Sequence, residues 1–355
     1  MILVIVVQDE NIKYVTDNSP DRKPLMKMDS AFVKLPLEFD VEQMVQEISQ
    51  FEENVWQPHP GKHPGNSALP LISYGGQNND DFSGRMQETP HLQKCEYIRQ
   101  ISSNFGEVLG RSRLMRLTGG SQVPIHVDAI YHWHRHVRIH IPVITNDQVI
   151  FHCGGQEVNM KAGECWLFDS WRNHKVVNHS EETRVHLVLD TAGSSRFWDI
   201  VDNTLAYHNK NGDYPTPQRL EYSPGKQASI LLEKYNITPV LSPGEVEGLI
   251  ENIIYEMRDT QGNDATKVEV LAKQMLRFCK DWRMIFSIFG YEEKGIPQYL
   301  TLLKSTKETL SHMPFDVQVK NGQLSKTILF ARVFSAAISP VVRQDFVRAL
   351  RGGSV

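Results

Sequence analysis

The middle of the chain is a succession of short apolar runs separated by turn signals, and this pattern restricts the fold more than any other feature. We expect strands at Leu114–Leu117, Val137–Val143, Val149–His152, Gln156–Met160, Cys165–Phe168, Lys175–Asn178 and Arg184–Leu189. The turns between them are Gly119-Gly120, Asn146-Asp147, Gly154-Gly155 and Ala162-Gly163. Many short strands at near-regular spacing predict a sandwich or barrel, and the double-sheet jelly roll is the closest common form.

The residues before this region mix strand and helix patterns. Met1–Val7 is apolar but too short for a secretory core or a membrane span, so we expect an opening strand. Apolar residues at helical spacing predict a helix over Val41–Phe51, and a second helix is expected over Leu92–Gly106. The stretch Pro58–Asp81 is rich in Gly, Pro and Asn, which predicts a loop.

The residues after the strand-rich region turn helical. Asn209–Gly225 is rich in Pro, Gly and Asn and indicates a linker or an ordered wrapping loop. A capping box at Ser242-Pro243-Gly244-Glu245 predicts a helix start there. Further helices are expected at Ala265–Phe289, Pro297–Ser311 and Lys326–Leu350, the last with a break at Pro340.

These patterns predict an α+β protein with a double-stranded β-helix core, that is, a cupin-like jelly roll. We expect a jelly-roll domain over residues 1–205, with flanking N-terminal helices, and a helical accessory domain over residues 206–355. The apolar stripes of the C-terminal helices leave three roles open: support or cover for the barrel, homodimerisation, or delivery of a partner or substrate.

Composition narrows the setting. A formal charge of −4 gives no electrostatic reason to expect nucleic acid or an anionic membrane as a partner. The four cysteines are scattered without a CxxC pair, which predicts buried free thiols in a reducing compartment. We therefore expect a cytoplasmic protein.

Nine of the 14 histidines fall between His126 and His186, and their spacing suggests a metal site. His126 and Asp128 stand two residues apart, so on a strand both side chains point to the same face. His174 lies 46 residues beyond Asp128, a separation that brings a jelly roll back to the neighbouring strand. Two imidazoles and one carboxylate on one face of an ion form the non-haem iron(II) oxygenase arrangement.

Two strands carry inward-facing cations. Alternation places Arg184, His186 and Val188 on one face of the last strand. An arginine held inside a dry barrel suits the far carboxylate of an iron-chelating 2-oxoglutarate; the alternative is a surface salt bridge. Arg138 and His140 alternate with aliphatic residues in the same way, which indicates either a second grip on a carboxylate or structural pairing inside the barrel.

The ordered combination of these pieces over residues 85–200 resembles the aspartyl/asparaginyl β-hydroxylase family. The quoted run is Arg113-Leu114-Met115-Arg116-Leu117, His126-Val127-Asp128, Arg138-Ile139-His140-Ile141-Pro142, Gly163–Asp169, Asn173-His174, Asn178 and Arg184-Val185-His186-Leu187. Since some family members lack the carboxylate ligand, the presence of Asp128 makes the chain more similar to the bacterial members that hydroxylate free amino acids such as proline.

The resemblance implies iron(II) at His126, Asp128 and His174, and 2-oxoglutarate bound by Arg184 with help from Arg138 and His140. The implied reaction uses O₂ to hydroxylate an unactivated C–H bond of an amino acid or of an Asp/Asn-type residue in a peptide, releasing succinate and CO₂. Two alternatives stay open: a cupin-like metalloenzyme that does not use 2-oxoglutarate, and a non-catalytic metal-bearing binding module. The segment Tyr131–His136 either receives a carboxylate-bearing substrate or packs the barrel mouth.

Overall fold

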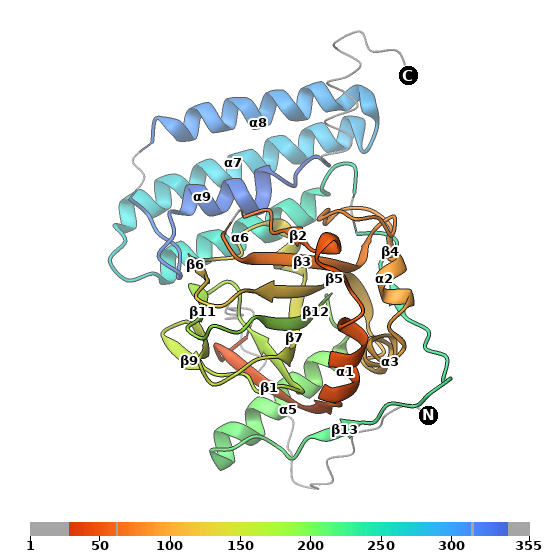
Figure 1. The fold of residues 1–355 in the computed structure, drawn as a ribbon. Coiled ribbons are helices and arrows are strands. Elements are labelled where there is room, and N and C mark those ends of the chain that lie inside the picture. The colour runs from red at the N-terminus through yellow and green to blue at the C-terminus, as the bar shows by residue number, and fades with distance from the viewer. Residues whose placement is uncertain (1–27, 62, 237, 314–315, 340–355) are drawn as a thin grey trace, which may run out of the picture.

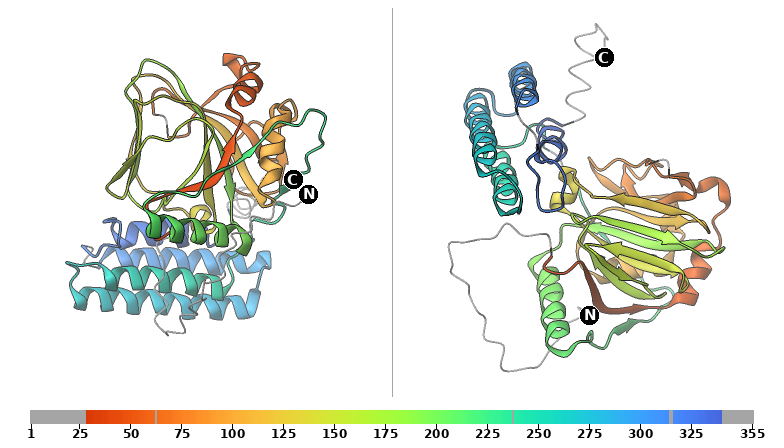
Figure 2. Two further views of the ribbon diagram at one scale, coloured as in Figure 1. Left: turned by 90° about the horizontal axis from the view of Figure 1, so that it is seen from below. Right: turned by 90° about the vertical axis from the view of Figure 1, so that its left-hand side faces the viewer.

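The computed structural model describes residues 28–61, 63–236, 238–313 and 316–339. The strand predicted at Met1–Val7 and the end of the helix predicted at Lys326–Leu350 lie outside these ranges. The described residues form a β-barrel and a group of helices beside it (Figure 1). Two further views show that the helices pack as a group against the barrel (Figure 2).

The barrel consists of two sheets that face each other. The larger sheet is built from β1 (Phe32–Phe39), β10 (Glu164–Phe168), β7 (Val137–Ile144), β12 (Arg184–Thr191), β5 (Val108–Leu117) and β3 (Asn66–Tyr74), joined by the short strands β2 (Gln57–Pro58), β4 (Met86–Glu88), β13 (Gln218–Leu220) and β14 (Leu231–Leu232). The smaller sheet has the order β6 (Gln122–His126), β11 (His174–Asn178), β8 (Val149–Cys153) and β9 (Gln156–Val158). This is the predicted α+β fold with a cupin-like jelly-roll core.

Each face of the larger sheet has its own core. Its outer face, with Ile139, Leu187 and Leu189, packs against helices. These helices are α1 (Val41–Ile48), α2 (Pro90–Gln93), α3 (Glu96–Asn104) and α5 (Ser195–Asn211). Between the sheets lies a smaller, aromatic core that includes Phe151 and Phe168. The alternation predicted for β12 is therefore confirmed, since its aliphatic residues face the helices and leave the polar ones facing inward.

The C-terminal helices have a separate core. They are α6 (Pro243–Asp259), α7 (Ala265–Phe289), α8 (Ile296–Ser311) and α9 (Ser325–Leu329), the last followed by a π-helical turn at Phe330–Phe334. As the capping box predicted, the Ser242 side chain accepts from the backbone N–H of Glu245 at the start of α6. The core runs from Val240 to Ile338, and α8 lies on the side away from the barrel (Figure 1).

The predicted loop Pro58–Asp81 is wrong in its middle, because β3 runs through it as a buried strand of the larger sheet. Proline argues against a paired strand, but the ladder with β5 shifts register just after Pro70, which is the kind of position that tolerates it. Within the described residues, the helix predicted from Lys326 onward leaves helical geometry after Phe334, earlier than the break expected at Pro340.

The division into domains at residue 205 stays a prediction. Helix α5 spans that position, and the segment after it continues along the barrel, where β13 pairs with β1 and β14 with β5. The four cysteines are free and buried, as predicted. Among the described residues, no helix is long and apolar enough to cross a lipid bilayer.

Candidate functional site

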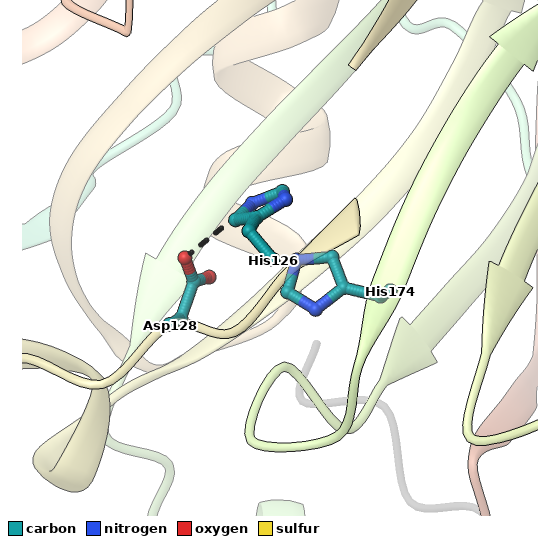
Figure 3. A group of neighbouring side chains, drawn as sticks. All are labelled: His126, Asp128 and His174. Carbon is teal, nitrogen blue, oxygen red and sulfur yellow. Dashed lines mark ion pairs between the residues drawn. The ribbon is translucent and has the colours of Figure 1, made fainter. Parts of the chain in front are cut away.

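The two histidines and the aspartate predicted as metal ligands lie together at one end of the smaller sheet. His126 ends β6 and His174 begins β11, and the two residues are paired across the antiparallel strands with ring centroids 4.1 Å apart. Asp128 follows just beyond β6, with its Oδ1 3.9 Å from Nε2 of His126. One ligand atom of each residue lies within 4.8 Å of the others, and the side chains point toward one another (Figure 3).

Both imidazoles are oriented by the backbone. The Nδ1 atom of His126 lies 2.8 Å from the carbonyl oxygen of Pro124, and the Nδ1 atom of His174 lies 2.9 Å from that of Arg172. Because a carbonyl only accepts, each Nδ1 carries the proton and each Nε2 is left with its lone pair. Second-sphere bonds of this kind fix the tautomer of metal-ligating histidines.

Burial keeps His174 neutral. Its side chain is buried against Phe168, and this desolvation lowers the pKa of His174 to about 4 despite the nearby Asp128. His126, in contrast, is 41% exposed on the edge strand of its sheet. The proposed metal site is therefore closed on the side of His174, which is packed in the barrel, and open to solvent on the side of His126.

Arg184 is a buried cation without an anion. It is 4% exposed, its Nε has no hydrogen-bond partner, and its side chain makes no ion pair with any described residue. Its guanidinium lies 5.0 Å from the centroid of the Phe151 ring. Burial lowers the pKa of Arg184 to about 9, which still leaves it charged at neutral pH. The predicted alternative, a surface salt bridge, does not describe this residue.

Two histidines beside Arg184 are unpartnered as well. His140 and His186 are 4% and 0% exposed, and neither ring nitrogen of either residue has a hydrogen-bond partner. Burial, followed by the charge of nearby arginines, holds the pKa of both well below the ordinary histidine value. Both rings lie within 6 Å of the Phe151 ring, at 5.8 and 5.5 Å. Buried polar atoms are normally hydrogen-bonded, so this unsatisfied group suits a polar ligand.

The ring of Phe168 lies between the unpartnered residues (Arg184, His140 and His186) and the proposed metal ligands. The centroid of Phe168 lies 4.9 Å from that of His174 and 5.1 Å from that of His140. A ligand that reaches from the three metal ligands to Arg184 would therefore run along Phe168 and Phe151. Such a molecule has an acceptor at each end, which is the chemistry of 2-oxoglutarate.

Arg138 is already paired. Its Nε donates to Oδ1 of Asp190 at 2.9 Å across adjacent strands, and its guanidinium stacks on Trp133 at 4.2 Å. Burial opposes its charge, but the carboxylates around it, Asp190 first and then Asp128 and Asp80, together raise the pKa of Arg138. Of the two predicted readings, the structure displays the pairing inside the barrel. Arg138 nevertheless lies close enough to Asp128 to interact with it electrostatically.

Two more arginines continue this polar row, and we call Arg111, Arg113 and Arg138, with Asp80 and Asp190, the arginine cluster. Arg111 and Arg113 are 3% and 2% exposed. Asp80, on the loop between β3 and β4, accepts a hydrogen bond from Arg113, and its backbone carbonyl accepts one from Arg111 at 3.0 Å. The Oδ2 atom of Asp190 lies 3.8 Å from Nε of Arg111. Three buried guanidinium groups thus face two carboxylates, leaving a net positive charge.

The arginine cluster was missed apart from Arg138, although the sequence carried a signal for it. Arg111 and Arg113 alternate on β5 just as Arg138 and His140 alternate on β7, and Asp190 continues the inward face of β12. Asp80 had no such signal, because it reaches the cluster from a loop.

The segment Tyr131–His136 is largely packed against neighbouring residues. It begins with α4 (Tyr131–Arg135), and both His132 and Trp133 are buried. Nε2 of His136 lies 2.5 Å from a carboxylate oxygen of Glu233, and the Tyr131 hydroxyl donates to the carboxylate of Glu245 in α6. Of the predicted readings, these contacts favour packing at the barrel mouth.

Comparison with known protein families finds a match to part of the chain. The model of a family described as aspartyl/asparaginyl β-hydroxylase matches residues 39–193, which include every residue proposed above as a metal or co-substrate ligand. This range contains strands β2 to β12 and ends before α5.

Three solved structures are similar to part of the chain. An oxidoreductase of the 2OG-Fe(II) oxygenase family from Burkholderia pseudomallei is 16% identical, over 46% of this chain and 85% of its own, with a TM-score of 0.35. A prolyl-4-hydroxylase from Pseudomonas putida is 12% identical, over 46% and 92%, with a score of 0.31. A Trichoplax adhaerens prolyl hydroxylase, solved with a hypoxia inducible factor peptide, is 14% identical over 46% and 84%, with a score of 0.34.

Proposed function

We propose that the protein is an iron(II)- and 2-oxoglutarate-dependent hydroxylase in which His126, Asp128 and His174 hold the iron; the match of residues 39–193 to the aspartyl/asparaginyl β-hydroxylase family supports this proposal. Two nitrogen donors and one carboxylate suit this ion and leave positions for co-substrate and O₂. When bound, iron and 2-oxoglutarate would activate O₂, one atom of which ends in succinate and the other in the hydroxylated product.

The co-substrate site is proposed at Arg184, and the unpaired state of this buried cation is the observation that carries the proposal. A carboxylate there would satisfy the guanidinium with two parallel hydrogen bonds. His140, unpartnered and next to Phe168, lies where it can donate to the end of the molecule nearer the metal ligands. Arg138 assists through its charge, since its own hydrogen bonds go to Asp190.

The protein itself contributes to the reaction by orienting the bound molecules and by excluding water from the site. Phe151 and Phe168 line the path between the metal ligands and Arg184, and both are buried between the sheets. Excluding water there strengthens each polar contact and protects reactive species from side reactions. The open side at His126 is left for the substrate.

The substrate is proposed to be an amino acid, or an Asp/Asn-type residue in a peptide, with succinate and CO₂ as co-products. The net positive charge of the arginine cluster supports a substrate that carries a carboxylate. A cupin-like enzyme without 2-oxoglutarate, or a non-catalytic binding module, gives no reason for an unpaired Arg184. Homodimerisation through the C-terminal helices stays a prediction.

A substrate screen tests the proposal. Iron-loaded protein is supplied with O₂, 2-oxoglutarate and one candidate at a time: proline, aspartate, asparagine, and capped peptides that contain aspartate or asparagine. Each carboxylate is matched with its amide or ester. We expect a candidate with a free carboxylate to accelerate succinate formation and to gain one oxygen atom. Equal acceleration by the neutral partners would contradict a carboxylate-recognising site.

A further inference from the structure

The C-terminal helices contact the segment that follows Asp128. Ala129 and Tyr131 are packed against the second core, the one that runs from Val240 to Ile338. The Tyr131 hydroxyl donates to the Glu245 carboxylate in the first turn of α6, and Arg135 donates to the same carboxylate at 3.0 Å. The chain is therefore anchored to the helices within three residues of a metal ligand.

A second set of contacts reaches the segment that precedes His174. The Asn321 side chain donates to the carbonyl of Trp171 at 2.9 Å, and Asn173 donates to the backbone carbonyl of Asn321 at 2.8 Å. The guanidinium of Arg332 stacks on the Trp171 ring at 4.6 Å. Arg332 is itself fixed, because it is 2% exposed and donates to the buried carboxylate of Glu256 at 2.9 Å.

The two anchored segments are also tied to each other. The backbone N–H of Asp128 donates to the carbonyl of Ser170 at 2.9 Å, and Trp171 donates from its indole to the carbonyl of Trp133 at 2.9 Å. The C-terminal region thus holds two segments that are hydrogen-bonded to each other and that lie next to Asp128 and His174, two of the three proposed metal ligands. The third proposed ligand, His126, ends the edge strand β6, and its side chain is exposed.

Metal affinity depends on such support. Ligands must be held within about 0.5 Å of their productive geometry, and loss of an outer-sphere contact typically costs about 10- to 100-fold in metal affinity. Both segments lie outside regular strands, where the sheet ladder cannot fix them. The contacts to Glu245, Asn321 and Arg332 fill that role.

We infer that the C-terminal helical region is the outer support of the metal site, with Asn321 and Arg332 as positioning residues for Asp128 and His174. The region is then part of the hydroxylase rather than an independent module. This inference rests on the proposed function, because it assumes that a metal binds at His126, Asp128 and His174. It adds a function for residues that lie beyond the family match.

Asn321 offers a sharp pair of variants, because its side chain has two separate tasks. Its Nδ2 donates to Trp171, whereas its Oδ1 accepts from the backbone N–H of Gln323 and shapes the local turn. Asn321→Asp keeps the acceptor for the turn and loses the donor to Trp171. Asn321→Ala loses both. Arg332→Lys keeps a charge beside Glu256 but loses the planar stack on Trp171.

The experiment titrates the metal-free full-length variants with Co²⁺ without oxygen, recording the dissociation constant and the ligand-field absorption of the bound ion. We expect Asn321→Asp and Asn321→Ala to bind Co²⁺ roughly tenfold more weakly, with an altered spectrum, and Arg332→Lys to show the same change. Tyr299→Phe is the matched control, because it removes a hydrogen bond to Gly290 inside the helical unit, away from the barrel.

Four outcomes would overturn the inference. Asn321→Asp and Arg332→Lys could both bind Co²⁺ like the wild type, or Tyr299→Phe could weaken binding as much as they do. In either case the contacts would be structural only. If the wild-type protein bound no Co²⁺, or His174→Ala bound it normally, the proposed metal site itself would fail and the inference with it.

Discussion

The guanidinium of Arg184 lies 5.0 Å from the ring of Phe151 and faces no carboxylate among the described residues. A buried charge without a partner is costly, and proteins normally pair it or lose it. Here an anion from solution can complete the pair. This relationship is why the co-substrate site is proposed on the polar inner face of β12.

Arg184→Lys keeps the charge but loses the two-pronged donor. We expect the KM for 2-oxoglutarate to rise by roughly one to two orders of magnitude, about 1.4–3 kcal/mol, with metal binding unchanged. Steady-state succinate formation at varied 2-oxoglutarate measures it. Arg116→Lys is the matched control, because Arg116 pairs with the exposed Glu53. Loss of metal binding with unchanged KM would show that Arg184 is structural.

Removal of either histidine ligand should abolish metal binding. We expect His126→Ala and His174→Ala to bind no iron(II) in anaerobic equilibrium dialysis, whereas Asp128→Ala binds it more weakly, since two imidazoles and the keto acid can still hold the ion. His152→Ala is the control, because His152 lies on the neighbouring β8 and pairs with Glu157. Normal iron binding by His174→Ala would remove that residue from the site.

Arg138→Ala should lower stability more than co-substrate binding. Its loss leaves Asp190 buried with a weaker partner, and breaking a buried pair costs about 3–5 kcal/mol. We expect the urea midpoint to fall and the KM for 2-oxoglutarate to rise less than in Arg184→Lys. A KM increase equal to that of Arg184→Lys, with no loss of stability, would make Arg138 a direct co-substrate ligand.

Acid should destabilise the metal-free protein through its buried histidines. Burial lowers the pKa of His174 to about 4 and holds that of His186 well below its ordinary value. The unfolded chain therefore binds protons that the folded chain rejects. Stability is full above about pH 6.5 and falls toward pH 4, by up to about 1.4 kcal/mol per pH unit for each such histidine.

Urea unfolding at pH 7, 6 and 5 tests whether the unfolding free energy of the metal-free protein falls as the pH falls. His186→Gln removes one of the buried titrating groups, so its unfolding free energy should decline less steeply with falling pH than that of the wild type. Parallel declines in the two proteins would mean that His186 is not held neutral.

The grouping of His126, Asp128 and His174 could be predicted because strand alternation and spacing are local signals, and the sheet pairing of His126 with His174 follows from the jelly roll. The helices at Ala265–Phe289 and near Pro297–Ser311 could be predicted from their apolar periodicity. Strand β3 could not, because Pro70 and its glycine-rich flanks read as a loop, and only tertiary pairing with β5 overrides them.

The contacts of the C-terminal region lay beyond sequence reasoning for a different reason. Asn321 and Arg332 meet Trp171 across some 150 residues of sequence, and neither belongs to a periodic or motif pattern. Likewise, Asp80 reaches Arg113 from a loop. Such pairs depend on how whole elements dock, which no short window of sequence records.

Conversion of 2-oxoglutarate to succinate tests the central claim most directly. Purified protein is supplied with iron(II), O₂ and 2-oxoglutarate, with no added substrate, and succinate is quantified over time. We predict slow succinate formation that requires both iron and O₂ and is absent from His174→Ala. Iron-loaded protein that binds its metal at these residues yet forms no succinate, with or without the candidate substrates, would contradict the account.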